Sequence, residues 1–123
     1  MAKRVKKGIE RRSECPISST LELVGDKWSL LIIRDMMILG KNKYNDFLAS
    51  DEGIATNILN DRLNMLTDMG IIGYTGTAKR KQYFLTEMGK DLKPIIEAYG
   101  RFGMKYFKGS REYVLKQMKQ HGK

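Results

Sequence analysis

Hydrophobic positions along the chain recur mostly at helical spacing, and residues 54–70 show this pattern most clearly. Leu59, Leu63 and Leu66 repeat at i, i+4 and i+7, which predicts one apolar helix face. The opposite face carries amide, hydroxyl and guanidinium groups, on Thr56, Asn57, Asn60, Arg62 and Asn64. A solvated helix face more often carries Lys/Glu pairs, although a surface helix rich in Asn is the plain alternative. Gly70 supplies the left-handed cap at which this helix should end.

The pattern before this segment predicts three further helices. Pro16 opens the first, because Pro is favoured at a first helical position. Asp26 is a good N-cap for a second helix over residues 27–39, which is apolar nearly all round and is therefore expected at the centre of the fold. A short helix over residues 44–49 follows. Its connection to the next helix is a tight, Gly-containing turn, and this arrangement is the signature of a helix-turn-helix motif.

The pattern after the Asn-rich helix changes to two short strands, at residues 71–75 and 82–86. The hairpin tip between them carries three consecutive cations, Lys79, Arg80 and Lys81. Thr86 should cap a long apolar helix, which Pro94 should kink or whose first segment it should end. A last amphipathic segment covers residues 111–120. This order of elements predicts a mainly α fold with a small β-hairpin wing, a winged helix-turn-helix domain.

The positive charge of the 123 residues is concentrated at the two ends of the chain. The net charge is +9, and residues 1–12 contribute +5, residues 101–123 contribute +6, and the middle of the chain contributes −2. We therefore expect a basic flexible arm at 1–14, a domain at 15–107 and a basic amphipathic tail at 108–123. A basic excess suggests a polyanionic partner, but basic tails also keep a domain soluble, so charge alone is weak evidence.

Several classes of function are not expected from this sequence. No apolar run is long enough to span a membrane, and the basic N-terminus is not followed by the apolar stretch of a secretory signal. A single Cys cannot form an intrachain disulfide, so the cytoplasm is the default location. The single His, His121, has no triad partner, and neither zinc spacing nor a Gly-rich phosphate loop is present. We therefore expect no enzyme activity, cofactor or metal.

The residues between 15 and 103 also carry a resemblance to a known family. They are Cys15, Pro16, Leu23, Gly25, Lys27, Trp28, Tyr44, Asn45, Phe47, Leu48, Gly53, Ile54, Gly70, Ile71, Tyr83, Leu85, Thr86, Glu87 and Gly89. With this spacing the chain resembles the HxlR-type winged helix-turn-helix regulators. The Gly-x-Lys-Trp and Leu-Thr-x-x-Gly elements are fairly specific.

The resemblance implies a prokaryotic, homodimeric transcription factor whose first and last helices form the dimer interface. In this family the second helix of the motif enters the major groove, and the wing reaches toward the minor groove. The chain departs from the family at Ala55, where Ser or another small polar residue is frequent. Thr56 could take over the cap and shift the helix start by one residue. The wing is also shorter and lacks the usual Pro residues. The aromatic, Met-rich last helices fit a dimer interface better than the alternative, a ligand pocket.

The candidate DNA-reading residues are Thr56, Asn57 and Asn60, which lie within the first turn and a half of the Asn-rich helix. Asn can bond bidentately to adenine, and Arg62 could reach guanine or a phosphate. Asn64, farther along, is expected to be too distant to reach the bases.

The candidate phosphate contacts lie on both sides of this helix in the sequence. Lys43 and Tyr44 begin the preceding helix, where backbone N–H groups and a cation would hold a phosphate. Lys79, Arg80 and Lys81 would contact phosphates or the minor groove, with Arg80 the candidate for the groove. A solvated turn and a solvated hairpin tip are the alternatives. The arm residues Arg4, Lys6, Lys7, Arg11 and Arg12 could follow flanking phosphates.

Cys15 is a candidate thiol sensor. It precedes a helix, and Arg11 and Arg12 are near it in sequence, so both features favour the nucleophilic thiolate. Some members of the resembled family use a Cys at this position to sense oxidants, quinones or aldehydes. The alternative is a small, inert residue packed beside the dimer helix.

Together these features predict a sequence-specific regulator of double-stranded DNA that acts as a homodimer on a pseudo-palindromic operator. The expected partners are this DNA and a second copy of the chain, with no membrane and no small-molecule inducer identified by the sequence. Two alternatives stay open: a winged-helix module that binds a protein or RNA, and a nonspecific nucleic-acid- or chromatin-binding protein.

Overall fold

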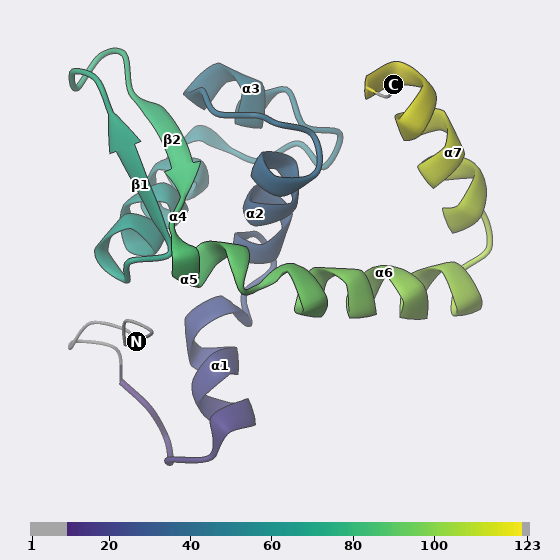
Figure 1. The fold of residues 1–123 in the computed structure, drawn as a ribbon, viewed down its shortest axis with the longest axis horizontal. Helices are drawn as coiled ribbons and strands as arrows, with labels where there is room; N and C mark the ends of the chain where they lie inside the picture. The colour runs from purple at the N-terminus through teal and green to yellow at the C-terminus, as the bar shows by residue number, and fades with distance from the viewer. Residues whose placement is uncertain (1–9, 122–123) are drawn as a thin grey trace. The chain divides into compact units, whose positions relative to one another are not determined.

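The computed structural model describes residues 10–121 (Figure 1). Arg4, Lys6 and Lys7 of the predicted arm lie outside the described residues. The chain forms two compact units, the first ending at Asp91 and the second beginning at Leu92. The domain expected at 15–107 therefore spans the boundary between two units.

Within the described part of the first unit, four helices precede the hairpin, namely α1 (Pro16–Val24), α2 (Ser29–Met37), α3 (Tyr44–Leu48) and α4 (Thr56–Asp68). As predicted, Pro16 occupies the first turn of α1, with Cys15 as its N-cap. The helix expected over 27–39 begins two residues later, with Trp28 as its N-cap in place of the predicted Asp26, because residues 26–28 form a turn first. The Asp26 carboxylate still bonds to the helix start. Its Oδ2 accepts hydrogen bonds from the N–H groups of Trp28 (3.0 Å) and Ser29 (2.9 Å).

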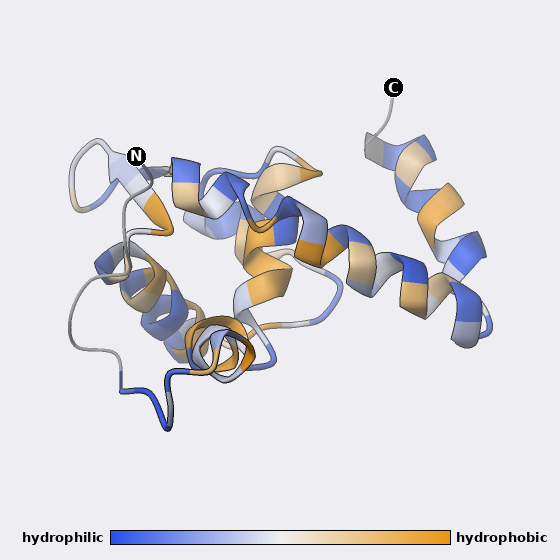
Figure 2. Ribbon diagram, turned by 60° about the horizontal axis from the view of Figure 1, so that its bottom comes forward, coloured by the Kyte–Doolittle hydropathy of each residue, from blue (hydrophilic) through white to orange (hydrophobic). Residues whose placement is uncertain are grey.

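The core of the first unit lies between α2, α3, α4 and the start of the hairpin. Its fully buried apolar side chains are Ile33, Phe47, Leu59, Leu63, Leu66, Ile71 and Ile72. The three leucines of α4 predicted to share one face are all among them, which confirms the helical pattern. Apolar and polar residues alternate along the helices in the way that a one-sided core requires (Figure 2).

The wing is an antiparallel hairpin of β1 (Ile72–Thr75) and β2 (Gln82–Leu85), with Ile72 opposite Leu85. Gly76 opens its tip with a φ of +91°, and a Cβ there would lie 2.2 Å from the carbonyl oxygen of Arg80. Only Gly fits this close approach. The backbone N–H of Tyr83 donates to the carbonyl of Asn42 (2.8 Å), which ties the wing to the segment before α3.

The segment after the wing differs from the prediction of one long helix. Thr86 caps only a short helix, α5 (Glu87–Lys90), and α6 (Lys93–Tyr106) begins separately. Pro94 lies in the first turn of α6, where its missing N–H costs no hydrogen bond. The prediction that Pro94 ends a first helical segment is therefore confirmed.

The second unit contains α6 and α7 (Ser110–His121), separated by Gly109 at a φ of +89°. The aromatic side chains of α6 and its C-cap stay exposed, and they are Tyr99, Phe102, Tyr106 and Phe107. Phe102 and Tyr106 lie one turn apart, with ring centroids separated by 5.0 Å. In the described part of the chain, no helix combines the length and apolarity that crossing a bilayer would need.

Candidate nucleic-acid interface

The helix-turn-helix motif is formed by α3, a turn and α4. Gly53 closes the turn with a φ of +69°. Ala55 is the N-cap of α4 in an extended conformation, without a side-chain hydrogen bond. Thr56 is the first helical residue and does not act as the cap, so the alternative start considered from the sequence is wrong. The Tyr44 hydroxyl instead fixes the start of α4, since it donates to the carbonyl of Thr56 (3.4 Å).

Two adjacent residues of α2 hold the segments on both sides of α3. The guanidinium of Arg34 donates to both carboxylate oxygens of Glu52 (3.0 Å each), in the turn after α3. The buried carboxylate of Asp35 contacts Arg34 (2.7 Å) and Lys41 (3.5 Å), before α3. The hydrogen bonds from Arg34 lower the pKa of Glu52 to about 2, although partial burial opposes this change. Glu52 is therefore ionised at neutral pH, and its pair with Arg34 anchors the turn of the motif to the central helix.

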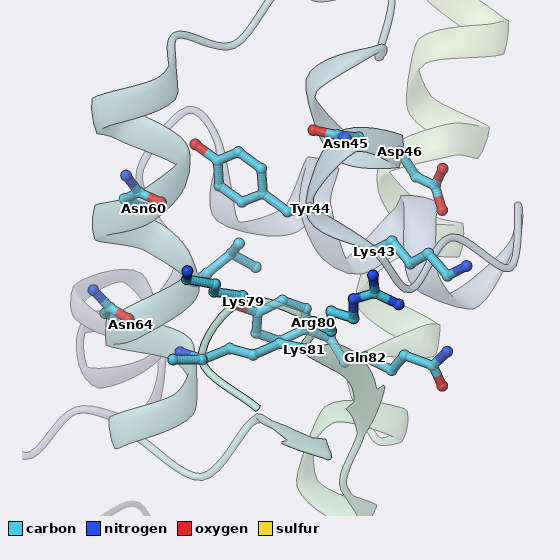
Figure 3. A pocket seen from close by; sticks show the side chains of 13 residues that line it. Lys43, Tyr44, Asn45, Asp46, Asn60, Asn64, Lys79, Arg80, Lys81 and Gln82 are labelled. Atoms are coloured by element: carbon cyan, nitrogen blue, oxygen red, sulfur yellow. The ribbon is translucent and has the colours of Figure 1, made fainter. Parts of the chain in front are cut away.

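A groove with a volume of about 870 Å³ runs between α3, α4 and the wing (Figure 3). It is lined by Lys43, Tyr44, Asn45, Asp46, Asn60, Leu63, Asn64, Ala78, Lys79, Arg80, Lys81, Gln82 and Tyr83. Four of these residues are cations, and Asp46 supplies the one carboxylate among the described residues that line the groove. Such a groove attracts a polyanion. Six residues predicted separately from the sequence meet here: Lys43, Tyr44, Asn60, Lys79, Arg80 and Lys81.

Thr56 and Asn57 are exposed in the first turn of α4 but do not line this groove; Asn57 instead lines a second hollow together with Asp26, Trp28 and Arg62. Asn64, which the sequence placed too far along the helix, is exposed and lines the groove together with Asn60. The signal was present in the sequence, because residues four apart lie on the same helix face. The polar face of α4 is therefore longer than its first turn and a half.

Arg62 lies on another flank of α4 and is paired with carboxylates. Its guanidinium is 3.3 Å from Asp26, in the turn before α2, and it also hydrogen-bonds to the neighbouring Asp61. Partial burial disfavours the charged form of Asp26, but hydrogen bonds from Ser29 and Trp28 and the charge of Arg62 lower its pKa overall. In the structure Arg62 thus joins α4 to the segment before α2, and its contact with guanine or a phosphate stays a prediction.

Comparison with known proteins identifies the family. The model of the HxlR-like helix-turn-helix family matches residues 23–111. The chain belongs to this family. The HTH-type transcriptional regulator MT3179 of Mycobacterium tuberculosis, itself uncharacterised, is 36% identical over 93 residues, which are 73% of this chain and 58% of the relative. The chain thus spans little more than half the length of that relative.

Two solved structures resemble this HxlR-like chain. The crystal structure of PA1607, proposed to be a transcription factor, has a TM-score of 0.70 and 34% identity, covering 78% of this chain and 68% of PA1607. The redox regulator HypR in its oxidised form has a TM-score of 0.64 and 31% identity, covering 74% of this chain and 96% of HypR. The matched relatives are named as transcriptional regulators, in agreement with the class of function expected from the sequence. In residues 10–121 no cluster of three or more His, Cys, Asp or Glu could hold a metal ion.

Cys15 of the HxlR-like chain is exposed at the start of α1. The two arginines expected to favour its thiolate form bonds to other groups. Arg12 pairs with Glu22 (2.6 Å), and Arg11 donates to the hydroxyl of Ser19 (3.3 Å). Because Cys15 is exposed, its thiol is accessible to a reagent. The guanidinium groups of Arg11 and Arg12, however, bind side chains of α1.

Proposed function

We propose that this HxlR-like protein is a transcriptional regulator that binds specific sequences of double-stranded DNA as a homodimer. The observation that carries the proposal is the groove in which the polar face of α4 lies opposite the basic wing. The relatives support it, since they are helix-turn-helix regulators. The polar face of α4 would contact base edges, and the cations of the wing would bind phosphates.

The base contacts are assigned to the exposed start of α4. Thr56, Asn57 and Asn60 would enter the major groove, where Asn bonds bidentately to adenine N6 and N7. Lys43 at the start of α3 and the wing cations would bind the backbone, with Arg80 as the candidate for the minor groove. Arg62 is assigned to a guanine or a phosphate, and this contact would compete with its pair to Asp26.

The homodimer is supported by apolar side chains exposed within each unit. On α1, Ile17 is 73% exposed, and on α6, Tyr99 and Phe102 are each 62% exposed. A monomeric soluble protein rarely exposes so many large apolar groups on so few elements. A second copy of the chain would cover them. Two-fold symmetry would then present two α4 helices to half-sites about one helical turn apart.

The proposal is tested by selecting bound duplexes from a random library and replacing Thr56, Asn57 and Asn60 together with Ala. The selected sequences should be pseudo-palindromic. The triple variant should lose at least about 100-fold of its preference for the selected duplex over a mixed-sequence duplex, since three base contacts that each contribute about 1–3 kcal/mol of discrimination are removed together. Equilibrium binding to both duplexes at one fixed salt concentration measures the ratio.

A matched control replaces Thr67, Asp68 and Gln120 with Ala, three polar residues that do not line the groove; its preference should stay at the parent's value. Equal preference in parent and readout variant would refute base reading by α4. Equal affinity of the parent for both duplexes would favour a nonspecific nucleic-acid binder. Absence of any duplex binding would favour an interaction module for protein or RNA.

We also propose that Cys15 senses thiol-reactive compounds. The supporting observations are its exposure at the start of α1 and the similarity of the fold to the redox regulator HypR. Addition of the Cys15 thiolate to a quinone carbon would place a bulky adduct on the first helix. Treating the parent with a quinone should change its operator affinity, and Cys15→Ser should bind alike with and without treatment. Since Cys15 is the one cysteine in the sequence, the mass of the intact protein reports the adduct directly. A Cys15→Ser protein that still responds like the parent would refute the sensor.

A further inference from the structure

The three consecutive cations of the wing do not point the same way. In Figure 3, the side chains of Lys79 and Lys81 extend toward α4, whereas Arg80 extends toward the side on which Lys43 lies. Asn60 and Asn64 lie on the part of α4 that borders the groove (Figure 3). The groove therefore has two cationic sides. One is formed by Lys43 and Arg80, and the other lies between the wing lysines and α4.

Lys81 is held on its side of the groove by an aromatic ring. Its Nζ lies 4.3 Å from the centroid of Tyr74, a cation–π distance. Tyr74 is half-exposed on β1, directly opposite Tyr83 on β2, and the two rings pack edge to face at 6.0 Å. A flexible lysine at a hairpin tip would otherwise sample many rotamers, so this contact reduces the conformational freedom that binding would have to remove.

Tyr74, the ring that holds Lys81, is connected to the core through Tyr83. Tyr83 is 8% exposed and packs edge to face against Phe47 of α3, with ring centroids 6.2 Å apart. The backbone N–H of Tyr83 also donates to Asn42. Burial raises the pKa of Tyr83, and Tyr74 and Tyr44 raise it further, so its hydroxyl stays neutral and adds no negative charge to the groove. A row of rings thus connects the buried face of α3 to the wing lysine.

Asn64 supplies a neutral hydrogen-bond donor on α4, across the groove from the wing. It lies one turn beyond Asn60, on the same face of α4, and it is exposed to the groove. An Asn amide and a Lys ammonium are both common donors to DNA phosphate oxygens. A base edge would have to reach past the first turn and a half of the helix to meet Asn64, whereas a backbone strand running through the groove would pass beside it.

We propose that Lys81 and Asn64 bind one DNA backbone phosphate between the wing and α4, and that Tyr74 is the positioning residue that holds Lys81 for this contact. This inference rests on the proposed function and deepens it. It assigns roles to Asn64 and Tyr74 that neither the sequence analysis nor the family similarity supplies. It also separates Lys81 from Arg80, which faces the Lys43 side of the same groove.

The test is a double-mutant cycle of Tyr74→Leu and Lys81→Gln in the full chain, with Tyr74→Phe as the matched control. Binding to a mixed-sequence duplex of about 30 base pairs is measured over a range of salt concentrations. Lys81→Gln should make the slope of log K against log salt shallower by about 0.9 per subunit. Tyr74→Leu should weaken binding about two- to five-fold, and Tyr74→Phe, which keeps the ring, should match the parent. In the Lys81→Gln background, Tyr74→Leu should have no further effect.

Two further readouts separate positioning from simple destabilisation. In the free protein, ring-current shifts of the Lys81 ε-methylene protons should be present in the parent and in Tyr74→Phe, and absent in Tyr74→Leu. Asn64→Ala should weaken binding to selected and mixed-sequence duplexes by the same factor, because a phosphate contact carries no sequence information. An Asn64→Ala variant that changes the preference between the two duplexes would make Asn64 a base reader and overturn its assignment here.

The remaining outcomes are equally decisive. If Tyr74→Leu weakens binding by the same factor in both Lys81 backgrounds, Tyr74 supports the wing without acting through Lys81, and the inference is wrong. If the parent binds duplex DNA but none of the three positions alters its affinity, this inference fails and the proposed function stands. If the parent binds no duplex, both fail together.

Discussion

Removing all four positive charges from the groove should lower the affinity for duplex DNA by about three orders of magnitude at about 0.1 M salt. The residues to be replaced with Gln are Lys43, Lys79, Arg80 and Lys81. Each phosphate contact releases counterions, and each one lost should make the salt slope shallower by about 0.9, hence by up to about 3–4 per subunit. Fluorescence anisotropy with the parent's selected duplex, repeated over a range of salt concentrations, measures both quantities.

The matched control removes four charges from the second unit by replacing Lys93, Arg101, Lys108 and Lys116 with Gln. All four are exposed, so net charge falls by the same amount without any change to the groove. The control should retain most of the parent's affinity and its salt slope within about one contact. If the two quadruple variants lose equal affinity, the groove has no special role, and overall charge alone attracts DNA.

The fold could be predicted where the determining interactions are local in sequence. The i, i+4, i+7 leucines specified the buried face of α4, and Asp26 specified the start of α2 through bonds to residues two and three positions later. The wing followed from two short β-rich runs with a Gly-containing tip. In each case one short window of the sequence contains both partners of the interaction.

The site was harder to predict where the partner of a side chain lies far away in the chain. Nothing near Arg62 in sequence indicated that Asp26 would neutralise it, because the two meet only when α4 packs beside the start of α2. The groove itself is formed by three elements, so the sequence could not indicate that Asn64 and the wing cations line the same groove. The prediction that Asn64 does not reach the bases is unaffected by this.

The Leu-Thr-x-x-Gly element, recognised in the sequence as a family resemblance, now has a physical explanation. The hydroxyl of Thr86 donates to the carbonyls of Gly70 (2.6 Å) and Ile71 (2.8 Å), and it accepts the N–H of Gly89 (3.2 Å). The element thus joins α5 to the segment that links α4 to β1. Gly89 is buried at this junction, where the two backbones approach too closely for a side chain.

Gly89→Ala should therefore destabilise the first unit by about 2–3 kcal/mol and lower its unfolding midpoint by about 10 °C. A Cβ at Gly89 would lie 2.3 Å from the carbonyl oxygen of Ile71 and 3.0 Å from Leu85 Cδ2, so backbone must move to admit it. Thermal unfolding followed by tryptophan fluorescence reports this unit, because Trp28 is the one tryptophan in the sequence.

Gly100→Ala is the matched control. A Cβ at Gly100 would meet no heavy atom within 4 Å, and Ala is favoured over Gly inside a helix by about 1 kcal/mol. That variant should keep the Trp28 transition of the parent and gain helical signal by circular dichroism. A Gly89→Ala protein that unfolds at the parent's temperature would show that α5 can move away from Ile71 at no cost, and the explanation given for the Thr86–Gly89 element would be wrong.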